Sequence, residues 1–236
     1  MSDQDLIALL RLQLAPHVGA VTAKKLLVAF GSPAEIFNQK KHQIVKVDGV
    51  GQLAAKGLFD PQYLDAAMTE LRYIRDHAIP FSYFMHADYP EYLKHCIDAP
   101  ILLFKKGHID LKNRKIISVV GTRNMTSYGA SFIEAFMADL APLNPVIVSG
   151  FAYGVDIAAQ RAAMAHGLQT IGCMAHGLNQ VYPKAHAKYR TNVEKNGGFL
   201  TEFHSSSQPE RENFLKRNRI IAGIIQATVV IESAEK

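Results

Sequence analysis

The sequence predicts an α/β fold, in which a Rossmann-like, doubly wound, mainly parallel sheet follows a small all-helical domain. From residue 115 onward, apolar runs of strand length alternate with segments whose apolar residues have helical spacing. Such an alternation is typical of a parallel sheet covered by helices on both faces. Residues 1–77 show short amphipathic segments separated by glycine-containing turns. We therefore expect a helical domain over residues 1–77 and a Rossmann-like domain over residues 78–236.

In the helical part, Gly19, Gly49 and Gly51 lie in stretches of the form apolar–Gly–apolar that run into a helix-forming segment. Such a glycine hairpin can present backbone N–H groups to a phosphate, or it can simply form a tight turn between helices. The sequence leaves these two interpretations open. The helices expected here are 5–14, 20–30, 33–37, 51–58 and 61–77.

The pattern changes near residue 79, where apolar runs bounded by polar connections predict strands. Helices are expected where apolar residues recur at helical spacing, several of them ending at glycine. The expected strands are 79–86, 100–107, 115–121, 145–150, 169–177, 199–203 and 227–233. The expected helices are 127–141, 154–167, 185–198 and 217–226.

Composition narrows the class of protein. The chain has 236 residues, of which 48% are hydrophobic and 20% charged, and a net charge of +5, which permits a polyanionic partner. No apolar run reaches the roughly 18 residues that suggest a membrane-spanning helix. Cys96 and Cys173 are the only cysteines, which fits a reducing cytosol and offers no metal framework.

The loops after four predicted strands are rich in Gly, Ser, Thr, Asn and cations, and each precedes a predicted helix. Ligands of doubly wound sheets bind beyond the carboxyl ends of the strands, and free N–H groups at helix N-termini favour anions. We therefore expect Arg123, Lys184, Arg217 and Arg219 to converge on an anion site at one rim of the sheet.

Other interpretations of the same residues stay open. Arg219 could form a structural ion pair with Asp156 or Glu202, and Ser149 and Gly150 could form only a tight turn. Asp156 is expected to cap a helix or to hold a loop. Glu202 ends a strand and could be catalytic, although we expect a structural role. The histidines His166, His176 and His186 lack metal-binding spacing, and no metal site is predicted.

Several enzyme classes lack their signatures in this sequence. The loop "GTRNMTSYG" does not match the dinucleotide fingerprint, and no Walker motif occurs. No Ser–His–Asp or Cys–His set stands out at the loops. A site that binds phosphate without a catalytic group suits a phosphodiester polymer, so no cofactor and no catalytic residue are predicted.

Six stretches then make the sequence recognisable: "YPEYLKHCIDAPILLFKKG", "ISVVGTRNMTSYG", "IVSGFAYGVDIAAQRAA", "VYPKAH", "GGFLTEF" and "FLKRNRIIAGIIQATVVIES". Together they resemble the DNA-processing protein A (DprA/Smf) family of bacterial natural transformation. The helical part before them is similar to the SAM-like, helix-hairpin-helix region of that family.

The resemblance implies a cytoplasmic, non-enzymatic protein that binds single-stranded DNA, protects incoming strands and loads the RecA recombinase on them, usually as a homodimer. It also implies a basic binding pocket formed by Arg123, Lys184, Arg217 and Arg219. Among the few aromatic residues of the loops, Tyr128, Phe151 and Phe214 are the candidates for stacking on bases. The DNA-binding residues implied are Gly121, Thr122, Arg123, Ser149, Gly150, Phe151, Lys184, Lys216, Arg217, Asn218 and Arg219.

Two departures from the family pattern matter. Gln160 stands where the family usually has histidine, and the chain ends where the family would continue with more sheet, so the domain is expected to be truncated and dimer contacts incomplete. An alternative class is a Rossmann-like, nucleotide-cleaving phosphoribohydrolase, but the PGGxGTxxE loop of those enzymes is absent from the sequence. A dinucleotide-dependent enzyme is disfavoured by the missing fingerprint.

Overall fold

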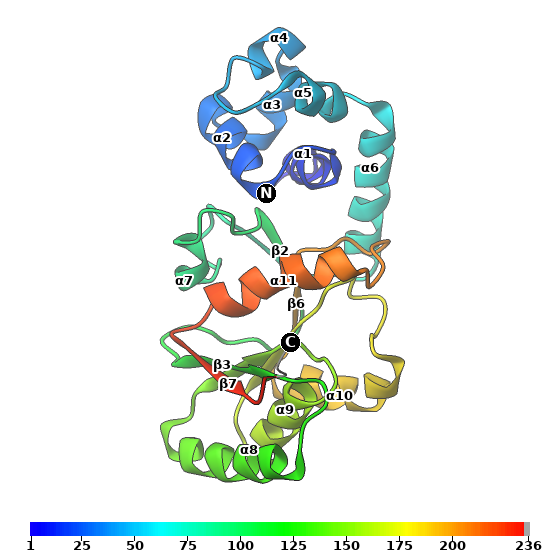
Figure 1. The fold of residues 1–236 in the computed structure, drawn as a ribbon. Coiled ribbons are helices and arrows are strands. Elements are labelled where there is room, and N and C mark those ends of the chain that lie inside the picture. Colours follow the sequence, from blue (N-terminus) through cyan, green and yellow to red (C-terminus); the bar gives the residue numbers. More distant parts are fainter. Residues whose placement is uncertain (234–236) are drawn as a thin grey trace. The chain divides into compact units, whose positions relative to one another are not determined.

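The computed structural model describes residues 1–233, and they form two compact units (Figure 1). The helical unit comprises residues 1–85 and 97–102, and the α/β unit comprises residues 86–96 and 103 onward. The domain boundary expected after residue 77 stays a prediction. Residues 78–85 group with the helices, and within this unit the Phe84 N–H donates to the Ile101 carbonyl at 3.1 Å.

The helical unit is built from short helices whose starting residues are encoded by the sequence. The Ser2 hydroxyl accepts a hydrogen bond from the Asp5 N–H at 3.1 Å at the start of the first helix. Ser32 and Asp60 cap the helices that begin at residues 33 and 61, and a proline follows each of them. Leu9 and Leu26 are among the fully buried side chains of its core. Its elements are α1 (Asp3–Leu14), α2 (Ala20–Phe30), α3 (Pro33–Asn38), α4 (Lys41–Ile44), α5 (Gln52–Leu58), α6 (Pro61–Asp76) and β1 (Phe81–Tyr83).

Glycines lie at the predicted turns of this unit. Gly19 and Gly51 directly precede α2 and α5, and Gly49 has a φ of 79°, which a residue with a side chain rarely adopts. The single-turn helix α4 was not predicted, because four residues are too few to show helical periodicity. The helices expected from the pattern are otherwise present, with ends shifted by one or two residues.

The α/β unit begins with the single-turn helix α7 (Glu91–Lys94) and then follows the predicted alternation. Its elements are β2 (Leu102–Gly107), β3 (Ile116–Gly121), α8 (Ser127–Leu140), η1 (Ala141–Leu143), β4 (Val146–Ser149), α9 (Val155–Ala165), β5 (Thr170–Cys173), η2 (Lys184–His186), α10 (Ala187–Asn196), β6 (Gly198–Thr201), α11 (Arg211–Gly223) and β7 (Ala227–Ile231).

The strands form a mostly parallel sheet of seven strands in the order β1–β2–β6–β5–β4–β3–β7. In the run β6–β5–β4–β3–β7 each strand is parallel to the next, with Ile117 opposite Ile147 and Val148 opposite Ile171. Strand β2 pairs antiparallel with β6. The predicted fold class, α/β with a mainly parallel Rossmann-like sheet, is confirmed.

Helices lie on both faces of this sheet (Figure 1). On one face, Ile133 and Met137 of α8 and Ala159 of α9 pack in a buried cluster with Val119 of β3 and Ile231 of β7. On the other face, α11 runs past β5 and α7. Because continuous apolar strands are buried on both sides, the loops at the strand ends carry the polar chemistry of the unit.

Strand β5 ends at Cys173, four residues before its predicted end, and the boundaries of β1 and α11 also differ clearly from the prediction. The apolar stretch 79–86 forms strand only over Phe81–Tyr83, because the Ile79 N–H closes the end of α6 by bonding to the Ile74 carbonyl and a turn joins His86 to Tyr89. Helix α11 begins at Arg211, six residues before the predicted start. The polar sequence "RENFLK" gave no apolar stripe from which this first part of the helix could be recognised.

The side chain of Gln160, in the middle of α9, is fully buried. Neither its amide nitrogen nor its amide oxygen has a hydrogen-bond partner among residues 1–233. The amide lies against the sheet, close to Gly172 of β5. An unpaired buried polar group costs about 1–3 kcal/mol of stability, so this position weakens the core.

We expect Gln160→Met to raise the free energy of unfolding by about 1–2 kcal/mol, because methionine has a similar length and no unpaired amide. Urea denaturation followed by circular dichroism measures this change. Gln169→Met is the matched control, since Gln169 exchanges two hydrogen bonds with the backbone of Asp110 at 2.7 and 3.1 Å and its loss should destabilise the protein. A lower urea midpoint for Gln160→Met would contradict this account.

Candidate nucleic-acid interface

The strand order places a topological switch point at β3. The chain moves from β3 through β4, β5 and β6 in one direction, and β7 then returns to the other side of β3. In open α/β sheets, ligands bind at such a reversal, outside the carboxyl ends of the strands. The switch point therefore lies at the ends of β3 and β7.

A cavity of about 330 Å³ occupies this position. Ser118, Val120 and Gly121 of β3 and Thr228 of β7 form one side, and helix α11 forms the other. Four predicted DNA-contacting residues come together here: Gly121, Arg123, Arg217 and Asn218. The carboxyl group of Asp156 also lines the cavity, so the site contains one acid beside its cations.

Arg217 is 5% exposed and ties two strands together. One terminal nitrogen of its guanidinium group donates to the Gly150 carbonyl at 2.7 Å and to the Cys173 carbonyl at 2.6 Å. Gly150 follows β4 and Cys173 ends β5, so the guanidinium group joins the carboxyl ends of neighbouring strands. Burial lowers the pKa of Arg217, and the nearby Cys173 and Asp156 oppose this shift.

Asp156, at the start of α9, holds the loop that follows β4. Its carboxylate accepts the Gly150 N–H at 3.1 Å and the Ala152 N–H at 3.4 Å. Burial raises the pKa of Asp156, while Arg217 and these N–H groups favour the charged form. The prediction that Asp156 holds a loop is confirmed, and the same contacts leave this carboxylate bound to the protein itself.

Arg123 lies at the surface, in the loop after β3. Its guanidinium carbon is 5.7 Å from the centre of the Phe214 ring, and that ring lies 5.6 Å from the ring of Tyr182. Lys184, two residues after Tyr182, is also exposed. A planar cation over an aromatic ring, with a second ring beside it, is an arrangement that can bind a phosphate and stack on a base.

The cations of "KRNR" do not face one site. They lie inside α11, where successive side chains are rotated by about 100°. Arg217 points to the strand ends, Arg219 forms an ion pair with Glu202, and Lys216 is exposed. Of the four cations expected to converge on one rim, Arg123 and Arg217 line the same cavity. The Arg219–Glu202 pair is one of the two partnerships anticipated for Arg219.

Phe151 and Ser149 belong to the interior. The Phe151 ring is fully buried against His186 and Phe199, so the structure corrects the expectation that it stacks on a base. The Ser149 hydroxyl donates to the Val119 carbonyl at 2.7 Å. Gly150 allows a close approach, but the group that fills the space is the Arg217 guanidinium.

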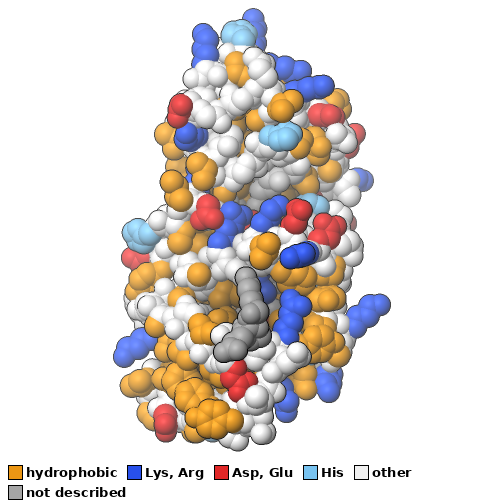
Figure 2. All heavy atoms as spheres, in the orientation of Figure 1, with side chains coloured by type: hydrophobic (Ala, Val, Ile, Leu, Met, Phe, Trp, Pro, Cys, Tyr) orange, Lys and Arg blue, Asp and Glu red, His pale blue; other side chains and the backbone are white. Residues whose placement is uncertain are grey.

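Of the remaining candidates, Thr122 lies in the loop after β3, beside Gly154. The backbone of Thr122 and Arg123 leaves no room for a Cβ atom at residue 154, and the φ of 73° there also favours glycine. Tyr128 is 76% exposed on α8. Figure 2 shows Lys and Arg side chains on the face that carries α10 and α11, with a few acids among them near α11.

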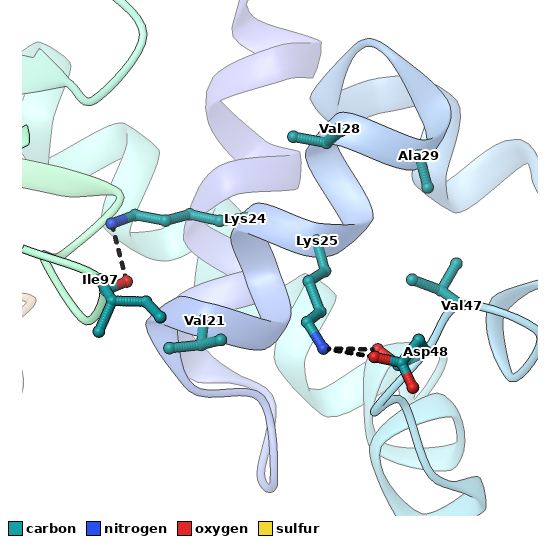
Figure 3. Close-up of a pocket in the computed structure, with 8 residues that line it drawn as sticks. All are labelled: Val21, Lys24, Lys25, Val28, Ala29, Val47, Asp48 and Ile97. Carbon is teal, nitrogen blue, oxygen red and sulfur yellow. Dashed lines mark hydrogen bonds and ion pairs between the residues drawn. The ribbon is translucent and has the colours of Figure 1, made fainter. Parts of the chain in front are cut away.

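In the helical unit, the hairpin around Asp48 is bound to α2 (Figure 3). The Lys25 ammonium group donates to the Asp48 carboxylate at 2.9 Å and to its carbonyl at 3.1 Å. Lys24 donates to the Ile97 carbonyl at 3.2 Å, across an apolar groove of about 490 Å³ that Val21 and Val28 also line. Both lysines of α2 are therefore engaged within the unit, and DNA contact by this hairpin stays a prediction.

Comparison with known proteins agrees with this architecture. The family model for DNA recombination-mediator protein A matches residues 81–236, about two thirds of the chain. The chain belongs to this family. DNA processing protein DprA of Streptococcus pneumoniae is 39% identical over 145 residues, covering 61% of this chain and 51% of that protein. The Bacillus subtilis DprA is 35% identical over 150 residues, covering 63% and 50%. The chain thus spans about half the length of these relatives.

Solved structures of two DprA proteins are similar to this fold. The X-ray structure of S. pneumoniae DprA has a TM-score of 0.79 at 27% identity and covers 100% of this chain and 80% of that one. The Helicobacter pylori DprA structure, which concerns its single-stranded DNA binding mode, has a TM-score of 0.58 at 28% identity, covering 66% and 71%. The predicted membership of the DprA/Smf family is confirmed.

Two features of the candidate interface were not recognised in the sequence. Tyr153 and Tyr182 lie in the loops after β4 and β5 and are 47% and 42% exposed, but they were not among the stacking candidates. The sequence feature that could have indicated them is an aromatic residue in a loop directly after a predicted strand. The hydrogen bonds of Arg217 could not be predicted from a local pattern. Their acceptors, the carbonyl groups of Cys173 and Gly150, lie 44 and 67 residues before Arg217 in the sequence.

Arg217→Met should destabilise the protein by about 3–5 kcal/mol, because it leaves the strand-end carbonyls unpaired and removes the partner of a buried carboxyl group. Arg123→Met, which removes the same charge at the surface, should change stability by less than about 0.5 kcal/mol. Chemical denaturation of both variants measures the difference. Equal midpoints for the two variants would show that Arg217 is not structural.

Proposed function

We propose that this chain binds single-stranded DNA at the carboxyl ends of β3, β4 and β5. The observation that carries the proposal is the exposed Arg123, whose guanidinium group lies over Phe214 beside Tyr182 at the switch point. Arg123, Lys184 and Lys216 are exposed and form no ion pair with any described residue. The H. pylori relative, whose structure concerns single-stranded DNA binding, supports this choice of ligand.

Backbone contact is the main mode of binding in this proposal. Cations recognise phosphates whatever the sequence, while aromatic rings stack on any base. A cavity between loops and a helix admits a flexible strand more easily than a rigid duplex. Binding is therefore selective for single strands and indifferent to base sequence.

Catalysis is not part of the proposal. The two carboxylates near the strand ends already have partners: Asp156 accepts backbone N–H groups, and Glu202 is paired with Arg219. No group of three or more His, Cys, Asp or Glu side chains that could hold a metal ion occurs in the part of the chain that the structure describes. No observation favours the alternative, a nucleotide-cleaving Rossmann-like enzyme.

The biological setting follows from the family. We propose that the protein acts in natural transformation, where it protects incoming strands and loads the RecA recombinase on them, as a homodimer in the cytoplasm. A content of two cysteines in 236 residues fits a reducing compartment. Among residues 1–233, no helix is long and apolar enough to cross a membrane. Stimulation of RecA strand exchange on single strands coated with a single-strand-binding protein tests this role.

Single-strand affinity should fall with salt with a slope of about 2, because three exposed cations each contribute about 0.7 on a single strand. Arg123→Gln should lower the slope by about 0.7. Fluorescence anisotropy with one single strand, its duplex and a scrambled strand, at several salt concentrations, measures both values. Lys112→Gln, at the amino end of β3, is the control for loss of one exposed charge.

Equal affinity for duplex and single strand, or a slope near zero, would contradict the proposal. Release of base or phosphate from a mononucleotide, lost in Glu202→Gln, would instead support the enzyme alternative.

A further inference from the structure

A second groove lies between α9 and α10, apart from the cavity at the switch point. Both helices begin at the carboxyl edge of the sheet, after β4 and β5, and pack beside each other. The groove has a volume of about 440 Å³. It is lined by Arg161, Met164 and Ala165 of α9 and by Tyr189, Asn192 and Lys195 of α10, among others.

The charge of this groove is positive and is not neutralised locally. Arg161, Lys188 and Lys195 are exposed, and none has an ion pair with another described residue. None of the described residues that line the groove carries a carboxylate. The one acid of α10, Glu194, is held by Arg190 at 2.8 Å and by Lys106 at 3.6 Å. In α9 the one acid is Asp156, which is buried at the start of the helix.

Two of these cations, Arg161 and Lys188, lie close to the ring of Tyr189. The Arg161 guanidinium carbon lies 5.4 Å from the centre of the Tyr189 ring, and the Lys188 ammonium nitrogen lies 5.1 Å from it. A guanidinium group held over a ring loses less side-chain entropy when it binds a phosphate, because it is already oriented. Asn192 adds an exposed amide to the same wall.

A series of ring contacts links the groove to the loop after β4. The ring of Tyr153, in the loop after β4, lies 4.9 Å from the ring of His186, which in turn lies 6.1 Å from Tyr189. Gly154, next to Tyr153, contacts the backbone of Arg123. These contacts form a series that runs from Tyr153, near the loop that carries Arg123, through His186 to Tyr189, which lines the groove. Figure 2 shows Lys and Arg side chains over the part of this face where Figure 1 draws α10.

We propose that the α9–α10 groove is a second contact surface for the same single strand of DNA, which passes Tyr153 and continues along α10. This inference rests on the proposed function of the switch-point cavity and adds a path for the strand. Arg161, Lys188 and Lys195 bind its phosphates, and Asn192 offers a hydrogen-bonding amide. Helix α10 is about 15 Å long, so only strands longer than the switch-point site reach the groove.

The test compares two oligonucleotides, of about 6 and about 20 nucleotides, with the wild-type chain and the variant Arg161→Gln/Lys195→Gln. For the long strand, the double variant should bind about tenfold more weakly at low salt, and its salt slope should fall by about 1.4 because two phosphate contacts are lost. For the short strand, affinity should not change. Lys112→Gln/Lys115→Gln, which removes two exposed cations at the amino end of β3, should affect neither strand.

Each result separates this inference from the proposed function. If the wild-type chain binds the long strand no more tightly or with no steeper salt slope than the short one, or if the groove variant weakens both strands equally or neither, the groove is not a second contact surface. If the wild-type chain binds neither oligonucleotide, the proposed function itself fails, and the inference with it. Circular dichroism of the groove variant checks that α9 and α10 remain folded. A double variant that does not fold is replaced by Lys195→Gln alone, for which the salt slope on the long strand should fall by about 0.7 because one phosphate contact is lost.

Discussion

Arg217 makes the contact on which the carboxyl edge of the sheet depends. A parallel sheet ends in carbonyl groups that have no further strand to pair with, and here those of Gly150 and Cys173 point toward the same place. One guanidinium group satisfies both, while Asp156 satisfies N–H groups of the following loop. The loops that form the candidate interface are thereby fixed by a buried cation and a buried acid, and not by apolar packing alone.

Neighbouring cations of helix α11 have different partners. Because α11 turns by about 100° per residue, adjacent charged residues face different surroundings. Arg217 faces the strand ends, Arg219 faces Glu202, and Lys216 faces solvent. Of these three cations of α11, only Lys216 remains available to a polyanion, together with cations of the loops such as Arg123. A basic motif in a sequence can therefore be mainly structural, while the binding charge lies elsewhere.

The sequence predicted the α/β class and the alternation of strands and helices, because periodicity acts locally and topology rules act on whole strands. The position of a binding site at the strand ends stays a prediction. It could not predict where α11 begins, since "RENFLK" has no apolar stripe. Neither the burial of Phe151 nor the partner of Arg217 could be predicted, because both depend on segments that are distant in the chain. The ion pair of Arg219 with Glu202 was one of two anticipated partnerships, and only the packed structure selects it.

The contact between Gly150 and Arg217 also constrains how this protein can change during evolution. A Cβ atom on residue 150 would collide with the guanidinium group, so glycine must stay while arginine is present. Loss of the arginine first would leave two buried carbonyl groups without a donor. Each substitution alone therefore disturbs the same contact. The two residues should therefore be inherited as a pair, each preserving the other across lineages that share this fold.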